Sequence, residues 1–244
     1  MGVPESMTVA SEPSSLGLST GAALTIGALA TPLLGLLSGL AVHGLLVSLF
    51  VFVGVGIAVS LAIPLGLPLG LANAITLFRA ILTSVLAGLS VQFSIVTEPA
   101  AGILPVAIAA FALATDGLDG WIARRSNTIS EFGARFDMEV DAFLILVLSV
   151  LCLVLGKAGA WILAAGLLRY AFVIAGIVWP ALTAPLFPSF RRKAVCVMQV
   201  CALIVMLLLE PPLANAIGAI TLGALVLSFA IDTAWLLRRT APAL

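Results

Sequence analysis

The sequence reads Asp116-Gly-Leu-Asp-Gly-Trp-Ile-Ala-Arg124 and, after eight further residues, Gly133-Ala-Arg-Phe-Asp-Met-Glu-Val-Asp141. Its four aspartates lie between apolar runs that are long enough to cross a membrane. Charged groups are costly near a bilayer and usually mark function there. Four like charges so close together would repel one another unless cations bind between them. We therefore expect a metal site formed by Asp116, Asp119, Asp137 and Asp141.

The composition of the whole chain is that of an integral membrane protein. Of its 244 residues, 62% are hydrophobic and only 9% are charged, whereas a soluble domain carries about 25% charged residues. The 11 basic and 11 acidic residues balance, so we expect no nucleic-acid partner. The three cysteines lie in apolar runs and are expected to be small buried side chains: Cys152, Cys196 and Cys201.

Eight apolar runs predict an all-α, polytopic membrane protein. A helix needs about 20 apolar residues to cross the hydrocarbon core, and these runs lack the alternation of barrel strands. The last six should form a core over residues 70–240, and the first two an N-terminal addition within 19–66. Residues 1–18 should be a disordered cytoplasmic tail. The predicted spans are 19–40, 44–65, 73–93, 100–124, 137–156, 159–180, 193–209 and 213–237.

The basic residues predict the orientation of these spans. With eight spans, three basic clusters fall on one side of the membrane: Arg124, Arg125 and Arg135; Arg191, Arg192 and Lys193; Arg238 and Arg239. Cytoplasmic loops carry an excess of Lys and Arg. We therefore expect both termini and the aspartate segment to face the cytoplasm, in a bacterial inner membrane.

The spacing of the aspartates predicts that they meet. On a helix that continues through residue 124, Asp116 and Asp119 share one face, and Asp137 and Asp141 share a face of the next helix. A turn around residues 126–130 would bring the two faces together. Ligation by carboxylates alone suits Mg²⁺, Mn²⁺ or Ca²⁺ rather than zinc. Two divalent ions would neutralise the four acids, as in a two-metal site for phosphoryl chemistry.

Small residues beside the aspartates predict room for a ligand. Gly120 and Gly133 each weaken a helix by about 1 kcal/mol relative to alanine, but they let a ligand approach the backbone closely. With Ala123 they would leave a slot wide enough for a nucleotide. Arg124 lies next to this slot and could bind a phosphate.

Together these residues carry a family resemblance. The pattern D-x-x-D-G-x-x-A-R-x8-G-x3-D-x3-D resembles the signature of the CDP-alcohol phosphatidyltransferases, and all eight fixed positions match: Asp116, Asp119, Gly120, Ala123, Arg124, Gly133, Asp137 and Asp141. The resemblance covers about residues 70–240 and implies a six-helix membrane domain that forms a homodimer. It implies transfer of the phospholipid group of a CDP-lipid, by default CDP-diacylglycerol, to the hydroxyl of a small polar alcohol, with release of CMP.

The resemblance also implies a role for each matched residue. Asp116, Asp119 and Asp137 would hold the metal ions, Mg²⁺ or Mn²⁺, and Asp141 would complete the site and act as the general base. The cytidine nucleotide would lie against Gly120, Ala123 and Gly133.

A second segment, Asn73-Ala-Ile-Thr-Leu-Phe-Arg79, resembles the P-N-x-x-T-x-x-R entry to the first core helix of the family, with Ala72 in place of the proline. Asn73, Thr76 and Arg79 could reach the nucleotide or its phosphates. The alternative is a helix cap and an arginine that extends to the membrane surface.

Basic residues outside the motif are candidates for binding the acceptor. Arg169 lies inside an apolar run and should face the interior with a partner, which could be the acceptor or an acid. Arg191, Arg192 and Lys193 could bind an acceptor phosphate or simply anchor the loop at anionic headgroups. Glycerol 3-phosphate is the favoured acceptor, with inositol phosphate or another alcohol as alternatives.

Two polar residues in apolar runs should have structural roles. Asp232 should pair with Arg239 or with another helix, and Gln199 should make an interhelical hydrogen bond.

The rival function is a membrane cation transporter that uses the aspartates as its ion site. Transporter sites tend to lie near the bilayer midplane on broken helices. These acids lie at predicted helix ends beside arginines, and a nucleotide-sized slot has no purpose in ion transport, so the sequence favours the transferase.

Overall fold

The computed structural model describes residues 18–92, 103–125, 131–184 and 189–240, apart from the side chains of residues 118–125, 131, 239 and 240. The described residues form α-helices and two short 3-10 helices, and no strand. The predicted all-α fold with eight long helices is therefore confirmed. The α-helices are α1 (Thr20–Leu37), α2 (Val42–Ala62), α3 (Leu71–Val91), α4 (Ile103–Arg125), α5 (Glu131–Val154), α6 (Leu163–Val178), α7 (Phe190–Leu208) and α8 (Pro211–Thr240); the 3-10 helices are η3 (Ala160–Ile162) and η4 (Pro180–Thr183).

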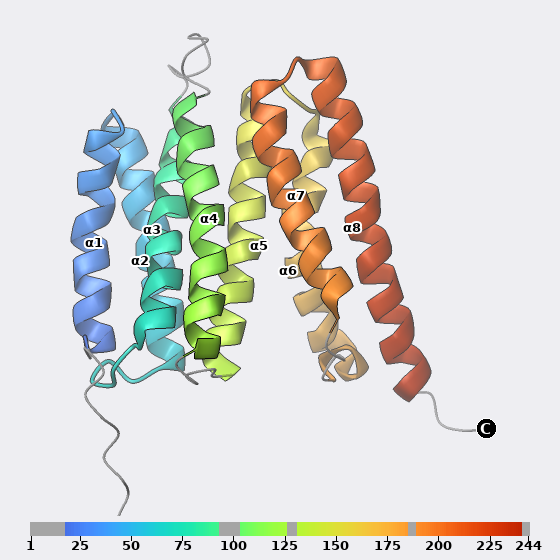
Figure 1. Cartoon of the computed structure of the whole chain (residues 1–244), viewed down its shortest axis with the longest axis horizontal. Coiled ribbons are helices and arrows are strands. Elements are labelled where there is room, and N and C mark those ends of the chain that lie inside the picture. The colour runs from blue at the N-terminus through green and yellow to red at the C-terminus, as the bar shows by residue number, and fades with distance from the viewer. Residues whose placement is uncertain (1–17, 93–102, 126–130, 185–188, 241–244) are drawn as a thin grey trace, which may run out of the picture.

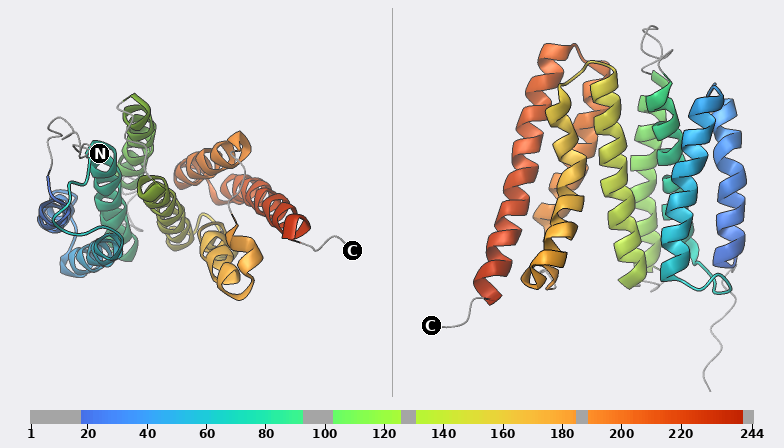
Figure 2. Two further views of the ribbon diagram at one scale, coloured as in Figure 1. Left: turned by 90° about the horizontal axis from the view of Figure 1, so that it is seen from below. Right: turned by 180° about the vertical axis from the view of Figure 1, so that it is seen from behind.

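The eight helices stand side by side in one bundle (Figure 1). Seen along the bundle, α5 lies in the middle, with α1 to α4 on one side and α6 to α8 on the other (Figure 2). Among the described residues, five helical segments are long and apolar enough to cross a membrane: α1, α2, α3, Ala160–Val178 and Pro211–Arg238. The described side chains of α4 form a shorter apolar segment, Ile103–Gly117. These segments indicate an integral membrane protein.

Helix α3 is the most enclosed of the membrane-length helices. It contacts α1, α2, α4 and α5, and every residue from Thr76 to Ser90 except Phe78 is buried. Unlike α1 and α2, which are apolar but mostly exposed, α3 is covered by protein over most of its surface. A charged residue on α3 is therefore held in the interior, which bears directly on Arg79.

The N-terminal hairpin of α1 and α2 is attached to α3 at one end and to the segment that precedes α3 at the other. At one end, the side chain of Gln92 accepts a hydrogen bond from the Ala41 N–H at 2.6 Å and donates one to the Gly39 carbonyl at 3.0 Å. A Cβ on Gly88 would lie 2.5 Å from the Gly44 carbonyl oxygen, so only glycine allows α2 and α3 to approach this closely. At the other end, the N–H of Thr20 donates to the Leu67 carbonyl at 2.8 Å.

Helix α5 extends beyond its predicted apolar span. The predicted span begins at residue 137, but the helix begins at Glu131. Residues 131–136 of α5 precede the predicted span, so that Asp137 lies within the helix rather than at its start. Helix α4 continues through Arg125 as predicted. Both helices therefore carry their aspartates on regular helical backbone.

Candidate functional site

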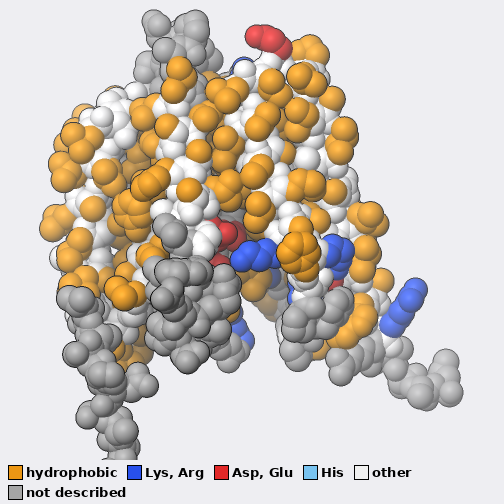
Figure 3. Space-filling view, in the orientation of Figure 1, with side chains coloured by type: hydrophobic (Ala, Val, Ile, Leu, Met, Phe, Trp, Pro, Cys, Tyr) orange, Lys and Arg blue, Asp and Glu red, His pale blue; other side chains and the backbone are white. Residues whose placement is uncertain are grey.

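Three helices bring acidic residues and one arginine together. Asp116 lies on α4, Asp137 and Asp141 on α5, and Arg79 on α3. The three aspartates each offer a carboxylate oxygen within 4.8 Å of those of the other two. These three carboxylates converge as the sequence predicts. In Figure 3, acidic and basic side chains meet near the middle of the bundle, on a face that is otherwise largely apolar.

Arg79 lies at the centre of this cluster. Its side chain is only 1% exposed. Its Nη1 atom is 2.6 Å from Asp137 Oδ1 and 3.1 Å from Asp116 Oδ1, and its Nη2 atom donates to Asp141 Oδ1. The alternative of an arginine extending to the membrane surface is therefore wrong for Arg79. The acids need its charge, because three partly buried like charges so close together would repel one another strongly without a counter-ion.

The acidic cluster fits a hard cation. Three carboxylates against one guanidinium leave a formal charge of −2 when all four groups are ionised. The donor atoms are oxygens only, which suits Mg²⁺ or Mn²⁺ better than zinc. Asp116, Asp137 and Asp141 could therefore hold a divalent ion.

Part of the predicted motif lies outside the described side chains. The backbone of α4 places Asp119 one turn beyond Asp116, but its side chain is not described, nor are those of Ala123 and Arg124 or the surroundings of Gly120. Gly133 lies on the first turn of α5, one turn before Asp137. The nucleotide slot therefore stays a prediction.

Asp141 presents its two oxygens to different surroundings. Oδ1 accepts from Arg79, whereas the contact recorded for Oδ2 within the described part of the chain is the thiol of Cys196 on α7, at 3.9 Å. The side chain of Asp141 is 23% exposed, and Arg79 is bonded to Oδ1 rather than to Oδ2. Sequence reasoning missed Cys196, which it treated only as a small apolar side chain. Cys152 is buried as predicted, but Cys201 is exposed and contradicts the prediction.

The other two residues of the α3 motif bond to their own helix. Asn73 donates to the Leu69 carbonyl at 2.8 Å, and the Thr76 hydroxyl donates to the Ala72 carbonyl at 3.2 Å. Asn73 is half-buried and Thr76 is buried. Neither bond is a helix cap, because both side chains donate to carbonyls four residues earlier and the N-cap of α3 is Gly70, which has no side-chain cap bond. Both side chains lie on the turns of α3 that precede Arg79.

Arg169 has an acidic partner. Its Nη2 atom is 2.5 Å from Glu139 Oε1 on α5. The structural ion pair, one of the two predicted alternatives, is thus present. The sequence did not single out Glu139, which lies inside the aspartate motif between Asp137 and Asp141.

Arg191 is bound to α8. Its Nη1 atom donates to the carbonyl and hydroxyl oxygens of Ser228 at 2.8 and 2.5 Å, and its Nη2 atom is 2.5 Å from Asp232 Oδ1. Asp232 therefore pairs with another helix, as one of the predicted alternatives stated, and Arg192 lies 3.6 Å from the same oxygen. Lys193, the third basic residue at the start of α7, is exposed.

This arrangement predicts unequal effects of two matched substitutions. Arg191→Met leaves the buried carboxylate of Asp232 without its closest partner, so the free energy of unfolding should fall by about 3 kcal/mol. Lys193→Met should change it by less than about 0.5 kcal/mol. Denaturant unfolding in detergent micelles measures both. Equal stabilities, with a raised acceptor KM in Arg191→Met alone, would instead assign Arg191 to acceptor binding.

Gln199 contradicts the prediction of an interhelical hydrogen bond. Its side chain is fully buried on α7, yet neither its amide nitrogen nor its amide oxygen has a hydrogen-bond partner in the described part of the chain. The sequence therefore predicts that Gln199 is buried, but it does not predict its hydrogen bonds.

Comparison with known proteins supports the motif. A model of the family described as CDP-alcohol phosphatidyltransferase matches residues 69–230, which begin just before α3 and end within α8. The match therefore includes Arg79 and all four aspartates, and it leaves out α1 and α2. No curated protein and no solved structure gives a significant match.

Proposed function

Because this chain belongs to the CDP-alcohol phosphatidyltransferase family, we propose that it transfers the phosphatidyl group of CDP-diacylglycerol to the hydroxyl of a small polar alcohol. Family membership and the apolar helices make it an integral membrane enzyme that transfers a phosphatidyl group from a CDP-alcohol. The donor lipid, the acceptor, the metal ions and the residue roles are the proposal. The observation that carries it is the convergence of Asp116, Asp137 and Asp141.

In the proposed reaction, the acceptor oxygen attacks the lipid-bearing phosphorus of the diphosphate. The bond from this phosphorus to the bridging oxygen breaks, and CMP leaves. Two Mg²⁺ or Mn²⁺ ions, held by Asp116, Asp119, Asp137 and Asp141, would neutralise the charge of the diphosphate and of the departing CMP.

Asp141 is the general base of the proposed reaction. A base needs a free oxygen within hydrogen-bond reach of the proton that it accepts. Among the described residues, Oδ2 of Asp141 has the weak contact with Cys196, whereas Oδ1 accepts from Arg79. Arg79 thus fixes the orientation of the carboxylate and leaves one oxygen to take the proton of the acceptor hydroxyl.

The nucleotide and the acceptor are assigned to neighbouring residues. We propose that the cytidine moiety lies against Gly120, Ala123 and Gly133, with Arg124 at a phosphate, and that the α3 segment with Asn73, Thr76 and Arg79 lines the same pocket. Glycerol 3-phosphate is the favoured acceptor, and inositol phosphate or another alcohol is the alternative. The basic residues that we propose as ligands of the acceptor phosphate are Arg169, Arg191, Arg192 and Lys193.

Among these four, Lys193 is the strongest candidate. It is exposed at the start of α7, whereas Arg169 is paired with Glu139, and Arg191 and Arg192 lie close to Asp232.

We further propose a homodimer in a bacterial inner membrane, with both termini and the acidic cluster facing the cytoplasm. The described chain begins and ends at the same end of the bundle, which is also the end where α4 meets α5 (Figure 1). The excess of Lys and Arg near this end supports the cytoplasmic assignment.

Vesicles that contain the purified protein and labelled CDP-diacylglycerol test the proposal. Glycerol 3-phosphate, inositol phosphate, glycerol and serine are supplied in turn, with Mg²⁺, with Mn²⁺ or with EDTA. We expect CMP release only with an acceptor and a divalent ion, fastest with glycerol 3-phosphate, and its complete loss in EDTA. Divalent-ion flux without CMP release under any condition would favour the cation transporter.

A further inference from the structure

The N-terminal hairpin of α1 and α2 lies outside the part of the chain that matches the family model. Seen along the bundle, α3 lies between this hairpin on one side and α4 and α5 on the other (Figure 2). Both helices of the hairpin contact α3. Because the matched part of the chain contains membrane-length helices of its own, anchoring in the membrane gives no reason for this packing.

Phe52 of α2 fills the space between the hairpin and α3. It is 1% exposed and belongs to the same cluster of buried side chains as Leu77, Ala80 and Ile81 of α3. A Cβ on Gly27 of α1 would collide with the phenyl ring of Phe52, so the ring lies directly against α1. The side chain of Phe52 therefore joins all three helices.

Phe52 lies at the depth of Arg79 in the bundle. The backbones of Gly44 on α2 and Gly88 on α3 touch, since a Cβ on Gly88 would lie 2.5 Å from the Gly44 carbonyl oxygen. Phe52 lies eight residues after Gly44, and Ala80 lies eight residues before Gly88. Because α2 and α3 run in opposite directions (Figure 1), Phe52 is level with Ala80, the residue that follows Arg79.

The hairpin covers the face of α3 that is opposite to Arg79. Gly88, which touches α2, lies nine residues after Arg79, and nine residues make about 2.5 helical turns. Leu77 and Ile81 lie two residues before and after Arg79, and two residues turn a helix by about 200°. A movement of α3 toward the hairpin would therefore withdraw the guanidinium of Arg79 from the three carboxylates.

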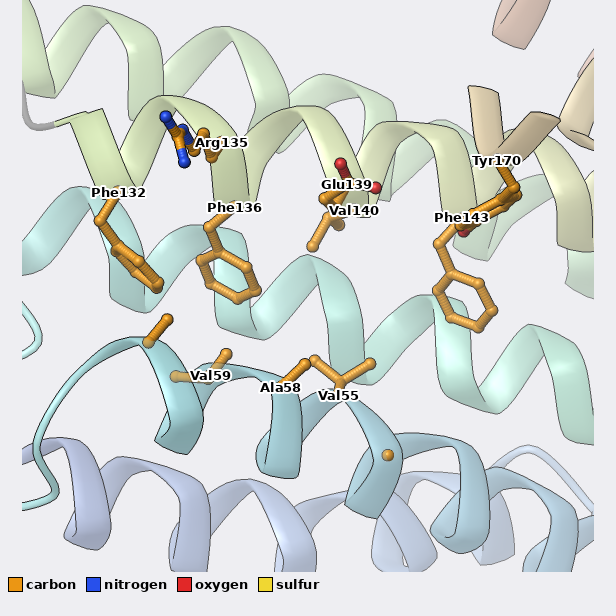
Figure 4. Close-up of a pocket in the computed structure, with 12 residues that line it drawn as sticks. Val55, Ala58, Val59, Phe132, Arg135, Phe136, Glu139, Val140, Phe143 and Tyr170 are labelled. Carbon is orange, nitrogen blue, oxygen red and sulfur yellow. The ribbon is translucent and has the colours of Figure 1, made fainter. Parts of the chain in front are cut away.

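Toward α5, the hairpin is packed less closely. A groove of about 660 Å³ lies between α2 and α5, and Figure 4 shows Ala58 and Val59 of α2 facing Phe136 and Val140 of α5 across it. The close contacts of α2 are with α1 and α3. The route from the hairpin to the acidic cluster is therefore α3.

We propose that the hairpin is a positioning element of the acidic cluster, in which Phe52 holds α3 in place so that Arg79 reaches the three carboxylates. Phe52 acts through α3 and does not touch the reacting groups. Arg79 in turn orients Asp141. The consequence for turnover rests on the proposed transfer reaction, whereas the consequence for the ion pairs does not.

Matched variants of the full-length protein test the effect on turnover. Phe52→Ala removes the buried ring, and Gly88→Ala forces α2 and α3 apart. The controls are Phe50→Ala, at a position that is 79% exposed, and Gly54→Ala, where an added Cβ would meet no described neighbour within 4 Å.

We expect Phe52→Ala and Gly88→Ala each to lower kcat at least about tenfold, because a displacement of about 1 Å can cost about 100-fold in rate. The acceptor KM should change less than about twofold, since the change acts on the orientation of the base. Phe52→Leu should recover most of the lost kcat, and both controls should keep the original value. CMP release from vesicles measures these constants.

Thermal unfolding in detergent with EDTA tests the effect on the ion pairs without turnover. Phe52→Ala should lower the Tm of the otherwise unmodified protein by about 10 °C. In an Arg79→Met background this fall should be smaller by at least about one third, because no guanidinium is left to withdraw. Met206→Ala, which removes a fully buried side chain of α7 on the other side of α5, should lower the Tm equally in both backgrounds.

Two results would overturn the proposal. One is an equal fall in Tm for Phe52→Ala with and without Arg79, and the other is an unchanged kcat in both Phe52→Ala and Gly88→Ala. If Phe52→Ala does not fold, Phe52→Leu replaces it in the Tm comparison. Absence of CMP release from the unmodified protein would reject the proposed reaction instead, and the Tm comparison would still decide whether the hairpin positions Arg79.

Discussion

Replacing Asp141 by asparagine should lower kcat by about 10³-fold, the range for the loss of a general base. Asparagine keeps the size and the oxygen that accepts from Arg79, but it cannot take a proton from the acceptor hydroxyl. Arg79 would still bind Asp116 and Asp137, so the fold should be retained. The nucleotide affinity should change little, because Asp141 is assigned to the proton rather than to the nucleotide. CMP release at saturating acceptor measures kcat, and equilibrium binding of CMP measures the affinity.

Ser149→Ala is the matched control for this substitution. Ser149 is a buried polar residue about two turns further along α5, and its hydroxyl donates to the Ile145 carbonyl of the same helix. Its loss should leave kcat unchanged. Asp119→Asn should differ from Asp141→Asn by a larger loss of metal affinity, because Asp119 is assigned to the metal ions alone. Normal turnover of Asp141→Asn would remove the general-base assignment.

Much of the fold could be predicted from the sequence, because the membrane imposes simple rules. Runs of about 20 apolar residues have to be helices in a bilayer, which gives eight helices and their order. The helix ends are less determined. Helix α5 begins at Glu131, well before its apolar span, since polar residues can continue a helix beyond the hydrocarbon core.

The acidic cluster could be predicted in part. The spacing of Asp116, Asp137 and Asp141 puts the acids on facing sides of two successive helices, and the structure brings these three together. Their partner could not be found in this way. Arg79 is 37 residues before Asp116, on a helix whose position in the bundle depends on long-range packing.

Pairing across helices is where sequence patterns fail. Asp232 and Arg239 lie on the same helix, and the sequence allowed them to pair. In the structure, Asp232 instead pairs with Arg191 of α7. Gln199 was expected to bond across helices and has no such bond among the described residues. Periodicity gives the face on which a residue lies, but the rotation of neighbouring helices decides which groups meet. The available signal for Arg79 was its isolation in an apolar run, since such an arginine needs a buried acid.

Arg79→Met should make the stability of the protein depend on divalent cations. The guanidinium is the counter-charge that the structure gives to Asp116, Asp137 and Asp141. Removing one partner of a buried ionic group costs about 3–5 kcal/mol, which is an upper limit here because the side chains of Asp137 and Asp141 are 38% and 23% exposed. In EDTA, the variant should therefore be less stable than the original protein by up to that amount. Mg²⁺ or Mn²⁺ bound by the same carboxylates would replace the lost charge, so millimolar Mg²⁺ should restore most of the stability. Thermal unfolding in detergent over a Mg²⁺ titration measures the effect.

Arg169→Met separates this effect from the general loss of an ion pair. Arg169→Met also removes the arginine partner of a carboxylate, because Arg169 pairs with Glu139. This pair, however, lies on the other face of α5 and is half-exposed. Its stability should fall by about 1 kcal/mol or less, and Mg²⁺ should not restore it. If Arg79→Met were as stable in EDTA as in Mg²⁺, the three carboxylates would not share a cation. The metal site would then have to be sought elsewhere, while the membership of the family would stand.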